Sequence, residues 1–167
     1  GLFEYDDNGL SYCHLSISRR HSPMVVTPTV LDLSAYLSGE DYKNLSAPEL
    51  DRRFLDVIKE VLGKRNISTV YLVGKGFEGD WMNVSLKTMC SNRKGFIGQN
   101  LFSKGACYNS MMEATQTKNQ TFIGMCDEMV PVTVYLSVSR GKETFHVDLV
   151  KAGSDWYNVR ESVEFIL

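Results

Sequence analysis

Alternating apolar and polar residues open the chain and predict a β-hairpin over residues 2–18. Its turn contains Asn8 and Gly9, a pair that accepts the positive φ angles of a tight hairpin. A third strand is predicted over residues 24–33, and Pro28 favours an edge position for it because proline has no backbone N–H to donate. Three neighbouring strands are therefore expected to begin the fold.

A helix and a buried strand are predicted next. Apolar residues recur at intervals of three and four over residues 47–62, and Gly63 follows as a helix stop. Ser46 is in position to cap this helix, with Glu49 as the acid of a capping box. Residues 67–73 are rich in β-branched side chains and become apolar on both faces, which is typical of a central strand.

The chain continues with a glycine-rich turn over residues 74–81. A second helix is predicted around residues 82–90, with Asp80 as a cap, and a short strand over residues 95–98. Residues 104–112 form a third helix rich in small side chains, which permit close approach to a sheet or a ligand. This alternation of helices and strands indicates an α/β protein.

The polar stretch at residues 115–120 is the best candidate for a domain boundary. Beyond it, antiparallel strands are predicted over residues 132–138, 144–150 and 156–167, with a turn at residues 140–142. The predicted fold is therefore a mixed sheet flanked by helices, followed by a small antiparallel β segment. Its two predicted regions are residues 1–114 and residues 121–167.

Composition narrows the class of protein. The 167 residues are 43% hydrophobic and 23% charged, which is ordinary for a globular domain. The net charge of −2 and the scattered basic residues do not favour a nucleic acid as partner. Apolar runs are much shorter than the ~20 residues needed to span a bilayer, so no membrane span is expected.

The termini and the cysteines bear on origin and compartment. The chain begins without Met and ends inside a strand-like run, so we expect a fragment of a longer protein. A cytoplasmic location with small buried thiols is the first expectation. Secretion, with disulfides, is the alternative, because four cysteines accompany four Asn-x-Ser/Thr sequons. The sequons begin at Asn44, Asn66, Asn83 and Asn119, and the cysteines are Cys13, Cys90, Cys107 and Cys126. The spacing of the four cysteines is not that of metal ligands.

Gly74, Gly76 and Gly79 spell the pattern GxGxxG between a strand and a helix. Such a turn can bring bare backbone against a nucleotide, although a tight turn that simply needs glycine is an equal alternative. A dinucleotide site would also need an acidic residue about 20 residues further on to bind the ribose, and the chain has Gln99 there. A dinucleotide oxidoreductase is therefore a weaker hypothesis. Phe77, with Trp81 beside it, can either stack on a base or close the core.

The order of elements over residues 1–113 resembles the second, adenosine-side lobe of the superfamily of actin, heat-shock chaperones and sugar kinases. Residues 72–76, Leu-Val-Gly-Lys-Gly, are similar to the Leu-Val-Gly-Gly turn of the chaperones, and residues 100–107 to their polar residue followed by Ala-x-Gly-Ala. The opening hairpin is similar to the superfamily's second phosphate hairpin, although only Gly9 remains of its several glycines and Leu10 stands where another is expected. The amino-acid sequence of residues 73–81 and 98–108 also resembles a family of bacterial proteins with a degenerate lobe of this kind.

The resemblance implies an actin-like ATPase (ribonuclease-H-like) lobe that binds ATP or ADP with Mg²⁺, or a vestigial lobe, and that is not a complete enzyme by itself. The residues implied at the adenosine side are Gly74, Lys75, Gly76 and Phe77, and those at the phosphate side are Asp6, Asp7, Asn8 and Gly9. The alternative from another class is a protein-interaction or assembly module. In that case the lobe is structural and the C-terminal strands bind a protein partner, through Trp156 and Tyr157 if these are exposed.

Overall fold

The computed structural model describes residues 1–19, 24–63, 65–114, 122–141 and 143–159. The chain forms two compact units. The first consists of Gly1–Leu15 and Thr29–Lys118, and the second of Ser16–Pro28 and Asn119–Leu167. The second unit thus includes residues 16–28, which the sequence prediction placed in its first region. The boundary predicted at residues 115–120 lies outside the described residues.

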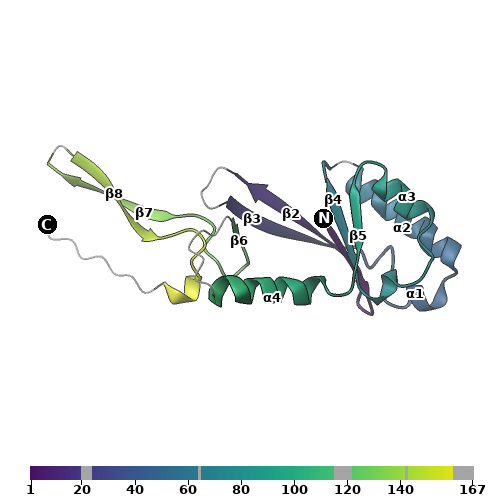
Figure 1. Ribbon diagram of the computed structural model, residues 1–167. Coiled ribbons are helices and arrows are strands. Elements are labelled where there is room, and N and C mark those ends of the chain that lie inside the picture. The colour runs from purple at the N-terminus through teal and green to yellow at the C-terminus, as the bar shows by residue number, and fades with distance from the viewer. Residues whose placement is uncertain (20–23, 64, 115–121, 142, 160–167) are drawn as a thin grey trace. The chain divides into compact units, whose positions relative to one another are not determined.

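The larger sheet is mixed, as predicted. Its strands are β1 (Leu2–Asp6), β2 (Gly9–Ser18), β3 (Met24–Asp32), β4 (Thr69–Val73), β5 (Lys94–Ile97) and β6 (Phe122–Gly124). Within the described residues their order is β5-β4-β1-β2-β3-β6. β1 pairs antiparallel with β2 and parallel with β4, and β4 pairs parallel with β5 (Figure 1). The opening strand β1 therefore lies in the middle of the sheet, beside the predicted central strand.

The predicted hairpin is confirmed. Asp6 pairs with Gly9 at its end, and Gly9 has the positive φ of 100° that the turn requires. β3 also forms where a strand was predicted, but its edge position is wrong, because Met24–Val26 pair in parallel with β6. Pro28 lies beyond this paired segment, so its missing N–H costs the pairing no hydrogen bond.

The longest described helix of the first unit is α2 (Ala47–Leu62), within the predicted bounds. Its apolar stripe is buried, whereas its predicted capping box is wrong. Ser46 occupies the N-cap position without a side-chain hydrogen bond, and Glu49 turns instead to Arg52 and Arg53, at 2.8 and 3.1 Å. These two ion pairs hold the pKa of Glu49 down to about 2.

The core of the first unit lies between one face of the sheet and the helices α2 and α3 (Val84–Cys90). Figure 1 shows these two helices together beside β4 and β5. Phe3 of β1 is fully buried, with its ring centroid 5.4 Å from that of Phe54. Leu72 of β4 and Met89 of α3 are also fully buried. Each such side chain contributes roughly 1.5–3 kcal/mol through removal from water.

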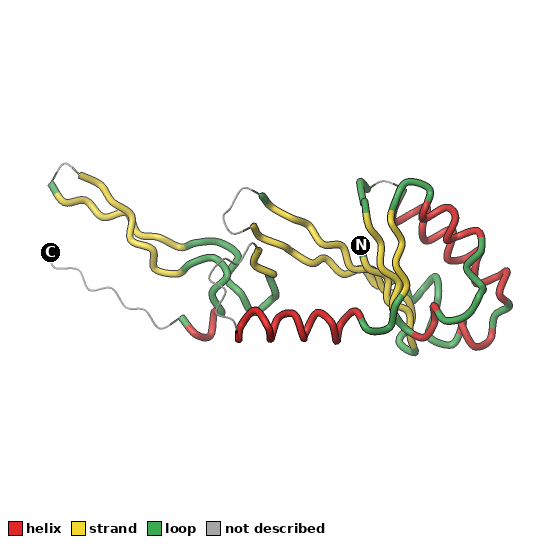
Figure 2. The backbone as a smooth tube through the Cα atoms, viewed as in Figure 1, coloured by secondary structure: helices red, strands yellow, loops and turns green. Residues whose placement is uncertain are grey.

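Two further helices complete the first unit. The short α1 (Asp41–Asn44) precedes α2, and α4 (Leu101–Ala114) contains the predicted small-residue helix and extends it at both ends. Figure 2 shows only a short loop between β5 and α4. This loop, residues 98–100, lies close to the glycine turn that follows β4.

In the second unit, β7 (Val134–Arg140) and β8 (Glu143–Val150) form the predicted antiparallel hairpin, with Gly141 at a φ of 65° in its turn. The strand predicted from Trp156 onward is wrong. Residues 156–158 form a 3₁₀ turn, fixed by a hydrogen bond from Asn158 to the Asp155 carboxylate at 3.1 Å. Residues 160–167, the remainder of that prediction, lie outside the described residues.

Candidate ligand-binding cleft

The glycine turn after β4 has its glycines for reasons that lie within the protein. Gly74 has a φ of 102°, and a Cβ atom there would lie 2.2 Å from the Tyr5 carbonyl oxygen. A Cβ atom on Gly76 would lie 2.3 Å from the Tyr5 ring. Since real Cβ atoms do not approach so closely, these two glycines let the turn pack against β1. Gly79 has a φ of 87° and open space around it.

The side chain of Gln99 is hydrogen-bonded to the backbone of this turn. Its side-chain oxygen accepts a hydrogen bond from the N–H of Gly74, and its side-chain nitrogen donates one to the Gly74 carbonyl, each at 3.0 Å. The side-chain amide of Gln99 thus pairs with the backbone N–H and carbonyl of Gly74, in the turn that was expected to present bare backbone to a nucleotide. Gln99 also stands where a dinucleotide fold would need an acid, and the structure gives it this structural role.

Phe77 belongs to the core. Its side chain is 2% exposed, and its ring lies 5.7, 5.2 and 6.2 Å from the rings of Tyr5, Phe54 and Trp81. The Trp81 indole N–H donates to the Gly76 carbonyl at 3.0 Å, which fixes the inner side of the turn. The expectation that Phe77 contacts a nucleotide is therefore wrong in this conformation, because its ring has no free face.

The hairpin turn of β1 and β2 is held from two sides. The Asn8 N–H donates to the Asp6 carboxylate at 2.8 Å, which is a local turn bond. Asp7 accepts hydrogen bonds from Lys43, at 2.7 Å, and from the Tyr42 hydroxyl, and these two bonds lower the pKa of Asp7. Gly9 packs under Ser34, where a Cβ atom would meet the Ser34 Cβ at 2.8 Å. The turn is thus an acidic surface held by hydrogen bonds and by close packing at Gly9.

The structure brings these two segments, far apart in the sequence, into one cleft of about 320 Å³. It is lined by Glu4, Asp6, Asp7, Asn8, Val73, Gly74, Lys75, Gln99 and Phe102. Of the predicted site residues, Gly76, Phe77 and Gly9 are not part of this lining, and Gly9 borders a second hollow that shares Glu4, Asp6 and Asn8 with the cleft. Phe102 was not predicted. Its signal in the sequence was a single large aromatic at the start of a helix of small residues.

Opposite charges face each other across the cleft. Lys75 is exposed and is the one cation among the described residues that line it. Glu4, Asp6 and Asp7 supply carboxylates, and Phe102, in the first turn of α4, lines the cleft as well. Phe102 is 55% exposed, so its ring is open to a flat ligand. The described residues contain no group of three or more His, Cys, Asp or Glu side chains that could hold a metal ion alone.

A family model described as family of unknown function (DUF5716), C-terminal, matches residues 1–127. The chain belongs to this DUF5716 family. The DUF5716 match includes every residue of the cleft and ends shortly after β6, ahead of the β7–β8 hairpin. No curated protein and no solved structure matches the chain.

Three other expectations can be compared with the structure. The four cysteines are free thiols, and the prediction that they are buried is wrong, since Cys90, Cys107 and Cys126 are exposed and Cys13 is half-buried. Trp156 and Tyr157 are exposed, as the interaction hypothesis requires, with fractions of 62% and 51%. Among the helices of the described residues, none has the length and apolar character needed to cross a membrane.

Proposed function

We propose that the first unit of this DUF5716 protein is a nucleotide-binding lobe of the actin, heat-shock chaperone and sugar-kinase type, which binds ATP or ADP with Mg²⁺ and does not form a complete catalytic site by itself. One observation carries the proposal. The hairpin turn at residues 6–8 and the glycine turn at residues 74–75, each implied separately by the sequence resemblance, line the same cleft.

The strand arrangement supports this proposal. The resemblance needs the phosphate hairpin to lie next to the strand that ends in the glycine turn, so that both turns face one ligand. β1 and β4 are neighbours and run parallel, with Glu4 of β1 paired with Val73, the residue that precedes the glycine turn. Leu10, which replaces a glycine of the superfamily pattern, has its side chain buried in the core at 1% exposure.

The side chains of the cleft suit a nucleotide, although the aromatic residue available to the base is Phe102 and not the expected Phe77. The Lys75 ammonium would pair with a phosphate oxygen, and the exposed Phe102 ring would stack on the base. Asp6 and Asp7 would hold Mg²⁺, which proteins usually bind through one or two carboxylates together with the phosphates of the substrate. When bound, the ion would neutralise charge between these acids and the phosphates.

Isothermal titration calorimetry of the full chain with ADP and ATP, with and without Mg²⁺, tests the proposal. Binding is expected with Mg²⁺ present, because the carboxylates repel bare phosphates. Lys75→Ala and Phe102→Ala should each weaken binding about tenfold, since each removes one charged or stacking contact. Glycine variants are unsuitable because a Cβ atom on Gly74 or Gly76 would strike Tyr5.

Lys87→Ala is the matched control, because Lys87 is an exposed lysine of α3 that does not line the cleft. It should bind nucleotide as the wild type does. Absence of heat at millimolar nucleotide, or equal affinity of wild type, Lys75→Ala and Phe102→Ala, would exclude this cleft as a nucleotide site.

A protein-interaction module remains the second candidate, and the exposed pair Trp156 and Tyr157 favours it. Their ring centroids lie 5.8 Å apart, edge to face, so together they present one aromatic surface. Exposed Trp and Tyr are typical centres of protein interfaces. Affinity capture with the full chain should then lose its specific partners on Trp156→Ala and keep them on Lys75→Ala. The opposite pattern, or loss in neither variant, contradicts this candidate.

A further inference from the structure

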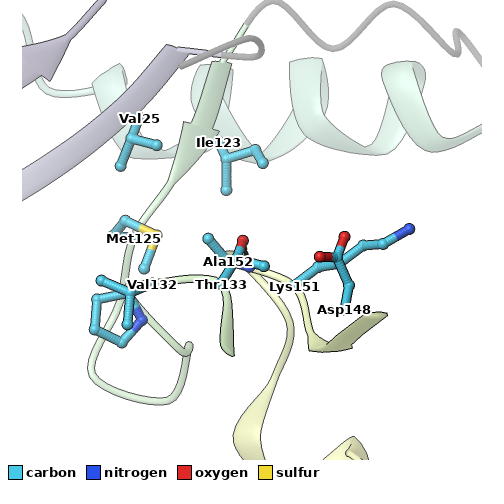
Figure 3. Close-up of a pocket in the computed structure, with 10 residues that line it drawn as sticks. Val25, Ile123, Met125, Val132, Thr133, Asp148, Lys151 and Ala152 are labelled. Atoms are coloured by element: carbon cyan, nitrogen blue, oxygen red, sulfur yellow. Dashed lines mark hydrogen bonds between the residues drawn. The ribbon is translucent and has the colours of Figure 1, made fainter. Parts of the chain in front are cut away.

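The second unit contains a larger cavity of about 490 Å³, separate from the cleft discussed above. It is lined by Val25, Ile123, Met125, Pro131, Val132, Thr133, Asp148, Lys151, Ala152 and Gly153, all of which belong to the second unit (Figure 3). Pockets that hold small molecules have volumes of about 300–1,000 Å³. The cavity is therefore large enough for a small organic ligand.

Backbone hydrogen bonds hold the walls of this cavity together. The Met125 N–H donates to the Val26 carbonyl at 2.7 Å, which continues the pairing of β3 and β6. The Gly153 N–H donates to the Val130 carbonyl at 2.9 Å, which ties the segment after β8 to the segment before β7. Gly153 has a φ of 86°, and a Cβ atom there would lie 3.1 Å from Ile123. The walls are thus formed before any ligand binds, which favours affinity.

The cavity has an apolar end and a charged end. Figure 3 shows Met125 and Val132 on one side of it, and Asp148 and Lys151 together on the other. Both charged residues are exposed, and within the described residues neither side chain makes a hydrogen bond or an ion pair. Each therefore has its full capacity to pair with a ligand.

Thr133 adds a polar group between the two ends. Its hydroxyl oxygen accepts a hydrogen bond from the Ala152 N–H at 3.1 Å. A hydroxyl that accepts in this way still has its own proton to donate. The charged end thus offers an anion in Asp148, a cation in Lys151 and a neutral donor in Thr133, beside an apolar wall.

We propose that this cavity is a binding site for a small free α-amino acid with an aliphatic side chain. The α-ammonium group would pair with Asp148, the α-carboxylate with Lys151 and the Thr133 hydroxyl, and the aliphatic side chain would lie against Met125 and Val132. A zwitterion with an apolar tail complements all three features at once. A simple carboxylic acid or a simple amine would leave one of the two charges without a partner.

Ligand-observed NMR with the full chain and three probes tests this assignment: L-leucine, 4-methylpentanoic acid, which lacks the ammonium group, and isopentylamine, which lacks the carboxylate. L-leucine is expected to bind about tenfold more tightly than either analogue, because each analogue loses one charge-assisted contact. Asp148→Asn should weaken L-leucine and the amine and leave the acid unchanged. Lys151→Met should weaken L-leucine and the acid and leave the amine unchanged.

Two exposed residues outside the cavity provide matched controls. Asp127→Asn and Lys104→Met remove the same charges elsewhere and should leave the affinity for L-leucine unchanged. Because Asp148 and Lys151 are exposed, their variants should fold, and circular dichroism checks this. The proposal is overturned if L-leucine does not bind at millimolar concentration, if either analogue binds as tightly as L-leucine, or if Asp148→Asn and Lys151→Met change nothing. None of these results bears on nucleotide binding by the first unit.

Discussion

The cap of α3 is supplied by a residue of another helix. Asp51 of α2 is 6% exposed, and its carboxylate accepts hydrogen bonds from the backbone N–H groups of Asn83, Val84 and Ser85, at 3.1, 2.8 and 2.9 Å. These donors belong to the first turn of α3, whose N–H groups have no partner within their own helix. One side chain thus joins two helices and satisfies three donors, so its removal should be costly.

The magnitude follows from these three bonds. Loss of an N-terminal cap costs about 0.5–2 kcal/mol, and buried donors that lose a charged acceptor cost more. We therefore expect Asp51→Ala to lower the free energy of unfolding by about 3 kcal/mol, and Asp51→Asn, which keeps one acceptor oxygen, by about 1–2 kcal/mol. Asp56→Asn on the same helix is the matched control. The Asp56 side chain is 52% exposed and lies 3.5 Å from Arg52, so its loss should cost less than about 0.5 kcal/mol.

Equilibrium urea unfolding measures these differences. Trp81 is a suitable probe, because it is 7% exposed and packs in the core beside Phe54, at 5.8 Å between ring centroids. The other tryptophan, Trp156, is exposed and can be replaced by Phe in every variant to isolate the Trp81 signal. If Asp51→Ala unfolds within 0.5 kcal/mol of the wild type, or if Asp56→Asn costs as much, the role of the carboxylate is refuted.

The pH dependence gives an independent check. Burial alone would raise the pKa of Asp51, but the hydrogen bonds from Ser85, Val84 and Asn83 hold this pKa below its usual value. The contribution of the carboxylate to stability is therefore present above the ordinary pKa of about 4 and is lost as the pH falls through the lower folded-state value. The gap between wild type and Asp51→Asn should shrink on acidification, and a gap that stays constant contradicts this reasoning.

Two further predictions follow from packing and burial. Gly76→Ala should lower the free energy of unfolding by about 3 kcal/mol because its methyl group meets the Tyr5 ring, whereas Gly105→Ala in α4, with nothing within 4 Å, should raise it by about 0.5–1 kcal/mol. Similar effects at the two sites in urea unfolding would exclude the steric explanation. Burial and the charge of Asp41 raise the pKa of Tyr5 to about 12. Ultraviolet titration of Tyr5→Phe should therefore lose absorbance near pH 12, and a loss centred near the ordinary value of about 10 would contradict it. The stability that neutral Tyr5 provides is present below about pH 10 and is lost as the pH rises towards 12.

Elements with a long repeating pattern could be predicted from the sequence. α2 was predictable because its apolar residues recur over four turns and seven of its residues are buried, and β4 because both of its faces are apolar. β6 was missed because its three residues are too few to show a period, and its partner β3 lies far away in the chain. The strand predicted from Trp156 failed because the Asp155–Asn158 hydrogen bond favours a turn over the alternating pattern.

Some residues that line the cleft could be named from the sequence, but their contacts could not. The pattern of Gly74 and Gly76 drew attention to a turn that lines one side of the cleft, yet the reason for these glycines is their packing against Tyr5, which is distant in sequence and close in space. The role of Gln99 has no local signature, since a glutamine in a loop usually faces water. The prediction of the α3 cap was wrong for the same reason. Asp80, nearby in sequence, was predicted as the cap, whereas Asp51 of α2 accepts the hydrogen bonds from the first turn of α3. Long-range partners of this kind are set by the tertiary fold.

The division of the chain into units limits how the protein can be dissected. The backbone passes between the two units three times, after Leu15, after Pro28 and after Lys118, because β2 and β3 each contribute residues to both. Ending the polypeptide after α4 would leave Met24–Val26 without the strand they pair with, as an exposed and aggregation-prone ribbon. Clean excision of the first unit instead requires Leu15 to be spliced to Thr29 through a short engineered turn.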